Sequence, residues 1–175
     1  MGNHLSSTEF ETTELVAPKA PCVAIDEHFL SHCPLRLDMG SGPIVRDMSS
    51  GASMFRVDGD CLRDLDGHTF AIVKKGIASK TIVDAGDHEL FVIKTGGSVA
   101  RCSVQDPISG ARHAYSVVGT LSSSKALILC DGEPVAKFRH NGSFHFGPCF
   151  HLDIAPGVDV ALVVVLCLAL FPSNY

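Results

Sequence analysis

The stretch that decides the fold is VALVVVLCLALF, residues 160–171, an unbroken apolar run between Asp159 and Pro172. A helix that is apolar on every side must be covered on every side, whereas a helix that crosses a bilayer needs about 20 such residues. The run exceeds the roughly 4 to 8 residues of a buried strand, and it has Pro-Gly before it and Pro after it, as helices do. We therefore predict a helix over residues 157–170 that lies inside protein.

The rest of the chain is typical of short strands separated by tight turns. Polar and apolar residues alternate with a period of two, and Asp-Gly, Gly-Gly and Asn-Gly pairs follow at short intervals. The candidate strands are residues 22–25, 35–38, 44–47, 53–57, 61–64, 69–74, 80–83, 89–94, 99–105, 113–119, 126–130, 134–140 and 149–154.

These two features fit together in a mainly β fold, a closed antiparallel β-barrel that encloses the hydrophobic C-terminal α-helix. The inward side chains of the strands would cover the helix, and closure of the barrel would remove exposed strand edges. The alternative is a β-sandwich in which the last segment is an additional core element. In the barrel, the buried central helix is represented by Val160, Leu162, Val163, Leu166 and Leu170.

Length and composition indicate one domain. The chain has 175 residues, 46% of them hydrophobic, and we expect a single domain over residues 21–175 after a Ser/Thr/Glu-rich leader, residues 1–20, that is disordered. The net charge of −5 argues against a nucleic-acid partner, because phosphate neutralisation needs a basic face. Residues 74–140 nevertheless hold 9 basic and 6 acidic side chains. We expect a monomer.

The first six residues, MGNHLS, fit the N-myristoylation pattern M-G-x-x-x-[ST], with Gly2 as the acylated residue. The alternative is an unmodified flexible terminus. A single acyl chain binds membranes weakly and needs a second contact. No secretory signal opens the chain, and the seven cysteines lack CxxC pairs, so we expect reduced cysteines and a cytoplasmic protein, peripheral at the cytosolic face of the plasma membrane if Gly2 is acylated.

Several segments carry a resemblance to a known family. They are FHLDIAPGVDVAL at residues 150–162, MFRVDG at 54–59, LDGHTF at 65–70, YSVVG at 115–119 and DGEPVAK at 131–137. Together they resemble the LURP-one-related family over about residues 35–171, and PGVDVAL is the most specific part. This family belongs to the tubby C-terminal-like superfamily, which also holds the phospholipid scramblases.

The resemblance implies a barrel of about twelve strands around the C-terminal helix. The link over residues 59–65 is shorter than in family members, which leaves the strand count open. The resemblance brings no catalytic residues. It implies an intracellular, non-enzymatic module that associates with membranes or phosphoinositides.

The candidate binding surface is basic. If barrel closure brings them together, basic side chains of the middle segment could hold a lipid headgroup through charge-assisted hydrogen bonds. The alternative is a set of ordinary solvated strand faces. The candidate headgroup ligands are Lys74, Lys75, Lys80, Arg101, Arg112, Lys137 and Arg139.

Other chemistry finds little support. The densest histidine groups, around His28 and around His151, match no standard zinc spacing, so we predict no metal and no cofactor. The chain has no G-x-S-x-G or HExxH motif, so we predict no catalytic residues. The sequence thus favours a non-enzymatic module that binds anionic phospholipid, phosphoinositide or a protein partner. The alternatives are a scramblase-like lipid-handling protein and a small hydrolase.

Overall fold

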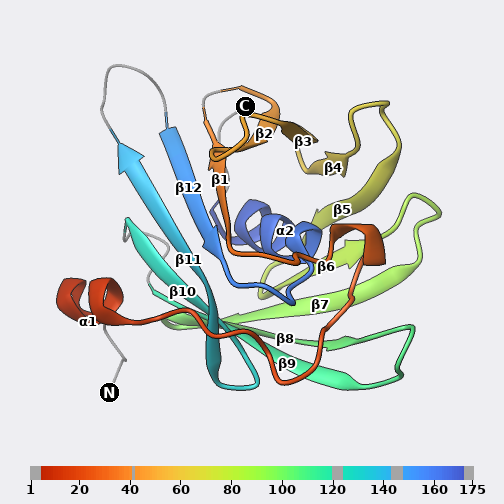
Figure 1. The fold of residues 1–175 in the computed structure, drawn as a ribbon. Helices are drawn as coiled ribbons and strands as arrows, with labels where there is room; N and C mark the ends of the chain where they lie inside the picture. The colour runs from red at the N-terminus through yellow and green to blue at the C-terminus, as the bar shows by residue number, and fades with distance from the viewer. Residues whose placement is uncertain (1–4, 41, 120–123, 143–147, 172–175) are drawn as a thin grey trace.

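The protein is a closed barrel of antiparallel strands around a central helix (Figure 1). The computed structural model describes residues 5–40, 42–119, 124–142 and 148–171. Each strand pairs with its neighbours in the sequence, and the last strand closes the barrel on the first. The strands are Leu35–Met39 (β1), Ile44–Asp47 (β2), Ser53–Asp58 (β3), Cys61–Arg63 (β4), Thr69–Lys75 (β5), Ser79–Val83 (β6), Glu89–Gly96 (β7), Val99–Gln105 (β8), Arg112–Val118 (β9), Lys125–Cys130 (β10), Glu133–Gly142 (β11) and Pro148–Ile154 (β12).

The central helix α2, Val160–Leu170, confirms the predicted enclosed helix. Each of its residues is at most 5% exposed, because inward side chains of the strands surround it. The helix begins three residues later than predicted, since Asp159 caps its N-terminus and accepts a hydrogen bond from the Leu162 amide at 3.2 Å. No helix among the described residues is long and apolar enough to cross a bilayer.

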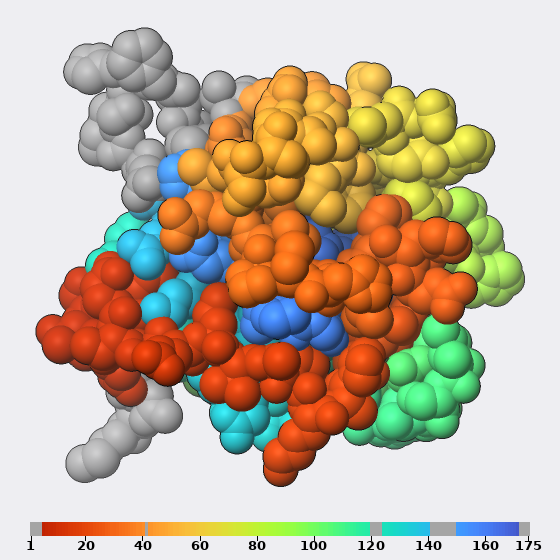
Figure 2. All heavy atoms as spheres, in the orientation of Figure 1, coloured from red at the N-terminus to blue at the C-terminus, as the bar shows by residue number. Residues whose placement is uncertain are grey.

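Asp159 also holds the segment that closes one end of the barrel. Residues 22–25, predicted as a strand, form only an isolated bridge from Cys22 to Val158. The Ala24 and Ile25 amides instead donate to Asp159 Oδ2 at 2.9 Å and 2.7 Å. The segment is therefore held beside the N-terminus of α2, and orange-red and orange parts of the chain surround the blue helix where it is still visible in Figure 2.

The strand count of twelve is confirmed. The short link over residues 59–65 still forms a hairpin, so no strand is lost there. β3 and β4 form a tight hairpin in which Asp58 pairs with Cys61, and Gly59 takes a left-handed φ of 60° in the turn. The hairpin is shortened rather than lost.

The structure differs from the prediction in the leader. Residues 7–12, predicted to be disordered, form the helix α1, Ser7–Thr12, which lies outside the barrel beside β10 and β11 (Figure 1). Ser6 and Glu9 form a capping box, and the Phe10 side chain is completely buried against the barrel. Gly2, the predicted acylation site, lies outside the described residues.

Candidate functional site

The interior of the barrel is occupied by protein. Because α2 fills it with side chains, a ligand has to bind to the outer surface or at a barrel end. The site is therefore built from outward-facing residues of the strands.

One open groove lies where two neighbouring strands separate. β7 and β8 pair only over Lys94–Arg101, Thr95–Ala100 and Gly96–Val99, although both strands continue beyond Lys94 and Arg101. Meanwhile β7 stays paired with β6, and β8 with β9. The result is a groove of about 610 Å³ in the barrel wall, with an apolar floor from residues that include Leu90, Phe91 and Val92.

Three cations line this groove, and we call them the groove cations: Lys94, Arg101 and Arg112. All three are exposed, and they lie on three adjacent strands, β7, β8 and β9. Within the described part of the chain, none of them forms an ion pair or a side-chain hydrogen bond. Glu89, at the start of β7, places one carboxylate on the same groove. The groove thus carries a surplus of unpaired positive charge beside apolar side chains.

Two of the predicted headgroup residues, Arg101 and Arg112, line this groove, and Lys94 lines it as well. The reason is register: Lys94 lies directly opposite Arg101, and Gln105 at the end of β8 lies opposite Arg112. Residues on one face of a strand alternate with a period of two, so a sequence pattern could have placed Lys94 outward with its neighbours. It could not have shown that β7 and β8 separate.

Three other predicted headgroup residues lie elsewhere and have partners. Lys74 forms an ion pair with Asp87, and Lys75 forms one with Asp60 at 2.8 Å. The Lys80 ammonium donates to the Ala169 carbonyl, in the last turn of α2. Burial lowers the pKa of Lys80, and Lys75 nearby lowers it further. Lys80 thus interacts with the central helix, and its ammonium is already used there.

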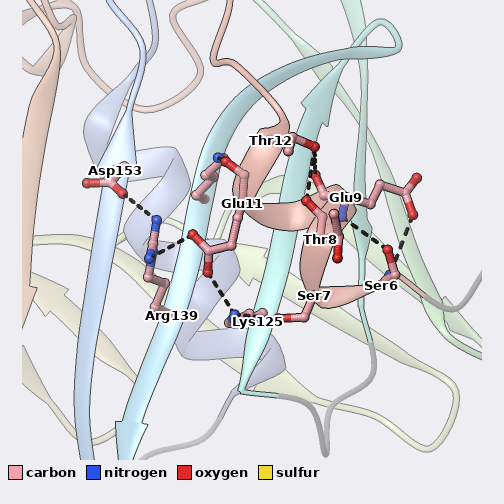
Figure 3. A network of polar contacts seen from close by, with 10 residues as sticks. Ser6, Ser7, Thr8, Glu9, Glu11, Thr12, Lys125, Arg139 and Asp153 are labelled. Carbon is pink, nitrogen blue, oxygen red and sulfur yellow. Dashed lines mark hydrogen bonds and ion pairs between the residues drawn. The ribbon is translucent and has the colours of Figure 1, made fainter.

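The last two predicted headgroup residues, Lys137 and Arg139, lie on β11 under α1. Glu11 forms ion pairs with Arg139 and with Lys125 of β10 (Figure 3). Lys137 is only 7% exposed and donates to the Glu11 carbonyl at 3.3 Å. The predicted set therefore divides into groove residues, residues paired elsewhere and residues covered by the leader.

In the part of the chain that the structure describes, one group of side chains has ligand atoms close enough to hold a metal. His113, Cys130 and Asp131 offer nitrogen, sulfur and oxygen atoms within 4.8 Å of one another, a mixed set of the kind that zinc takes. Asp131 accepts hydrogen bonds from the Ala114 amide and from His113 Nδ1, both at 2.8 Å. The Asp131 side chain therefore attaches the turn after β10 to β9. The Ala114 amide is the main cause of the lowered pKa of Asp131.

The buried thiols are poorly suited to nucleophilic chemistry. Burial raises the pKa of Cys22 and of Cys102 to about 12, so both stay protonated at neutral pH. Burial also raises the pKa of Cys130 and Cys167. The cysteines among the described residues are free thiols. They are Cys22, Cys33, Cys61, Cys102, Cys130 and Cys167.

These features define a class of protein: an antiparallel barrel module that is filled by its own C-terminal helix. A family model described as LURP-one-related matches residues 37–171. The chain belongs to the LURP-one-related family. This confirms the resemblance carried by the PGVDVAL segment and the hairpin motifs.

Two further comparisons add little. An X-ray structure of a protein from Arabidopsis thaliana aligns with 85% of this chain and 96% of its own, at 12% identity and a TM-score of 0.42, which is too low to carry an argument. The search of curated proteins found no match.

Proposed function

We propose that this protein is a non-enzymatic module whose β7–β8–β9 groove binds the phosphorylated headgroup of an anionic membrane lipid. The observation that carries the proposal is the set of three groove cations, which have no partner among the described residues, beside the apolar side chains that also line the groove. Arginine and lysine bind phosphate by charge-assisted hydrogen bonds, and arginine does so in a bidentate manner. Leu90 and Val92, both partly exposed, supply an apolar surface for the part of the lipid next to the headgroup.

The shape of the groove supports binding rather than catalysis. It is wide and open to solvent, so a bound molecule keeps contact with water on one side. A hydrolytic site that works through a side-chain nucleophile needs a base within hydrogen-bond reach of that nucleophile. The groove lining offers Ser103 and Cys102, and the high pKa of Cys102 makes it a weak nucleophile at neutral pH.

The test is sedimentation with phosphatidylcholine vesicles, with and without phosphatidylinositol bisphosphate. The double variant Arg101→Gln/Arg112→Gln removes two groove cations. Each basic residue near an anionic surface contributes about 1 kcal/mol, so binding should weaken by about 30-fold.

The matched control is Lys74→Gln/Lys75→Gln, which removes the same charge from cations that already pair with Asp87 and Asp60. We expect its binding to stay near that of the unchanged protein. Equal loss in the two double variants would mean that net charge, and not the groove, drives the association. Equal and negligible binding to both kinds of vesicle would refute the proposed function.

A second candidate function is binding of an extended protein segment. On the edges that face each other, β7 has no partner over residues 89–93 and β8 has none over residues 102–105. An added strand can pair with such edges. An acidic peptide would also suit the groove cations. A protein partner that protects the β7 and β8 amides from exchange, in the absence of lipid, would favour this function.

A further inference from the structure

A second basic cluster lies under the leader, and we call it the covered cluster: Lys125, Lys137 and Arg139. These cations lie on β10 and β11, and the Phe10 ring of α1 sits among them. The ring centroid is 5.3 Å from Lys125 Nζ, 5.2 Å from Lys137 Nζ and 5.1 Å from Arg139 Cζ. A cation within about 6 Å of an aromatic face is attracted to it, so Phe10 is held both by burial and by charge.

Glu11 neutralises much of the covered cluster. Its two carboxylate oxygens bond different cations, Oε1 to Lys125 Nζ at 2.7 Å and Oε2 to an Arg139 nitrogen at 3.2 Å (Figure 3). Lys137 Nζ reaches the Glu11 carbonyl. One glutamate thus contacts all three cations, Lys125 and Arg139 through its carboxylate, as the oxygens of a phosphate group would, and Lys137 through its main-chain carbonyl.

Apart from the contacts of Phe10 and Glu11, the leader is weakly held on the barrel. α1 has only six residues, and a helix of this length is not stable by itself in water. A backbone bond from Val16 to the Pro134 carbonyl, at 2.8 Å, attaches the chain just after α1. The contacts of Phe10 and Glu11 therefore decide whether α1 stays on the barrel.

Removal of α1 would leave cations in excess on this face. Among the described residues that contact the covered cluster, the remaining carboxylate is that of Asp153, 3.9 Å from an Arg139 nitrogen and 2.6 Å from Arg36 Nε. Lys137 and Arg139 also line a neighbouring cleft of about 430 Å³ that includes Leu15 and Leu35. The face would offer cations beside apolar surface, as the groove does.

We propose that α1 is an intramolecular ligand that occupies a second anion-binding site, and that a phosphorylated lipid headgroup at a membrane surface displaces it. Glu11 takes the place of the headgroup phosphate, and Phe10 takes the place of its apolar neighbour. The inference rests on the proposed function for the class of ligand, but it concerns other residues on another face of the barrel.

The experiment uses the full chain and compares Glu11→Gln with Glu14→Gln. Both variants lose one negative charge from the leader, and within the described residues the Glu14 side chain has no partner. Glu11→Gln should bind vesicles with phosphatidylinositol bisphosphate about fivefold more tightly than Glu14→Gln, the effect of one further cation at an anionic surface. Hydrogen exchange should show faster exchange at the Phe10 and Thr13 amides, which bond Ser6 and Glu9 carbonyls in α1.

Adding Arg139→Gln to Glu11→Gln identifies the site. The gain in binding should disappear in this double variant, and persistence of the gain would overturn the assignment to the covered cluster. Faster exchange in α1 without any gain in binding would overturn the displacement. Tighter binding of soluble inositol trisphosphate, with no gain on vesicles, would overturn the membrane lipid as its ligand.

The two proposals fail separately. Arg101→Gln/Arg112→Gln tests the groove in a chain with Glu11 intact, and the ratio between Glu11→Gln and Glu14→Gln tests the covered cluster. Both proposals would be supported if the groove double variant binds more weakly and Glu11→Gln still binds more tightly than Glu14→Gln by the expected ratio. A groove variant without effect, beside a preserved ratio, would refute the groove and leave the covered cluster standing.

Discussion

The ammonium group of Lys80 binds the carboxyl end of the central helix from inside the barrel wall. The last carbonyls of a helix have no partners within the helix, and a cation near them also interacts favourably with the helix dipole. Lys80 donates to the Ala169 carbonyl and so satisfies one of these groups where water has little access. At the other end, the Asp159 side chain caps the helix, so side chains satisfy backbone groups at both ends of α2.

Lys80→Met should lower the free energy of unfolding by about 1 kcal/mol, because one buried helix carbonyl loses its donor. Urea unfolding followed by circular dichroism measures the difference. The control is Lys75→Met, at the position paired with Lys80 across β5 and β6, where the ion pair with Asp60 is exposed and contributes little. A loss for Lys75→Met as large as that for Lys80→Met would contradict the helix-capping role.

The stability of α2 depends on its being surrounded by the strands. It presents apolar side chains in every direction, and each of them packs against strands. Leu166, near the middle of the helix, is 1% exposed and has no polar neighbour that could stabilise a charge on the same turn.

Leu166→Asp should prevent folding, since an unpaired buried carboxylate costs several kcal/mol against a typical total stability of about 5 to 15 kcal/mol. The variant is expected to lose the near-ultraviolet signal and to accumulate in the insoluble fraction. Leu65→Asp serves as the comparison, because Leu65 is 52% exposed, and it should fold normally. A folded Leu166→Asp protein would count against the enclosed helix.

The element α1 should respond to acid. The hydrogen bond to Lys125 is the largest cause that holds the pKa of Glu11 below its ordinary value of 4.5, with Arg139 and Lys137 adding to it. A carboxyl with a lowered pKa in the docked state contributes fully above its ordinary value, and the contribution is lost as the pH falls through the lowered pKa. The contribution of Glu11 to docking should therefore begin to decline as the pH falls below 4.5, its ordinary value, and α1 should leave the barrel once the pH is under the lowered pKa.

Limited proteolysis with an acid-active protease, with hydrogen exchange beside it, measures this release in the range where the barrel stays folded. Relative to the intrinsic exchange rate at each pH, the α1 amides of Glu11→Gln should be weakly protected throughout, with no further loss of protection in acid. Release at the same pH in Glu11→Gln and in the unchanged protein would show that another group controls the leader.

Barrel and helix are expected to unfold as one cooperative unit. The strands close on themselves through β1 and β12, and their inward side chains share one core with α2. Unfolding followed by tyrosine fluorescence, which reports on buried Tyr115, should coincide with unfolding followed by far-ultraviolet circular dichroism. Two separated transitions would mean that part of the barrel is stable without the helix.

The sequence predicted much of this architecture, because the signals for it are local. Apolar residues without interruption over 160–171 indicate an enclosed helix, and turn pairs such as Asp58-Gly59 mark the hairpins. The predicted strand over residues 22–25 does not form, because the Ala24 and Ile25 amides bond the Asp159 side chain rather than another strand.

The sites depend on contacts that the sequence does not display. Lys125 meets Glu11 across 114 positions, so a charge count could not show that the leader covers basic residues. Likewise, the groove exists because β7 and β8 separate after Lys94 and Arg101, and alternation of polar and apolar residues is the same in paired and unpaired strands. Partners decide which cations are available, and partners come from tertiary structure.

The order of the elements has a consequence for synthesis on the ribosome. Every strand precedes α2 in the chain, so the barrel wall leaves the exit tunnel before the helix that fills it. Until residue 170 emerges, inward side chains such as Ile128 lack the central helix that shares the core with them. The nascent chain therefore has to be held by a chaperone or remain open, and a message cut short before α2 would yield an aggregating product and not a smaller barrel.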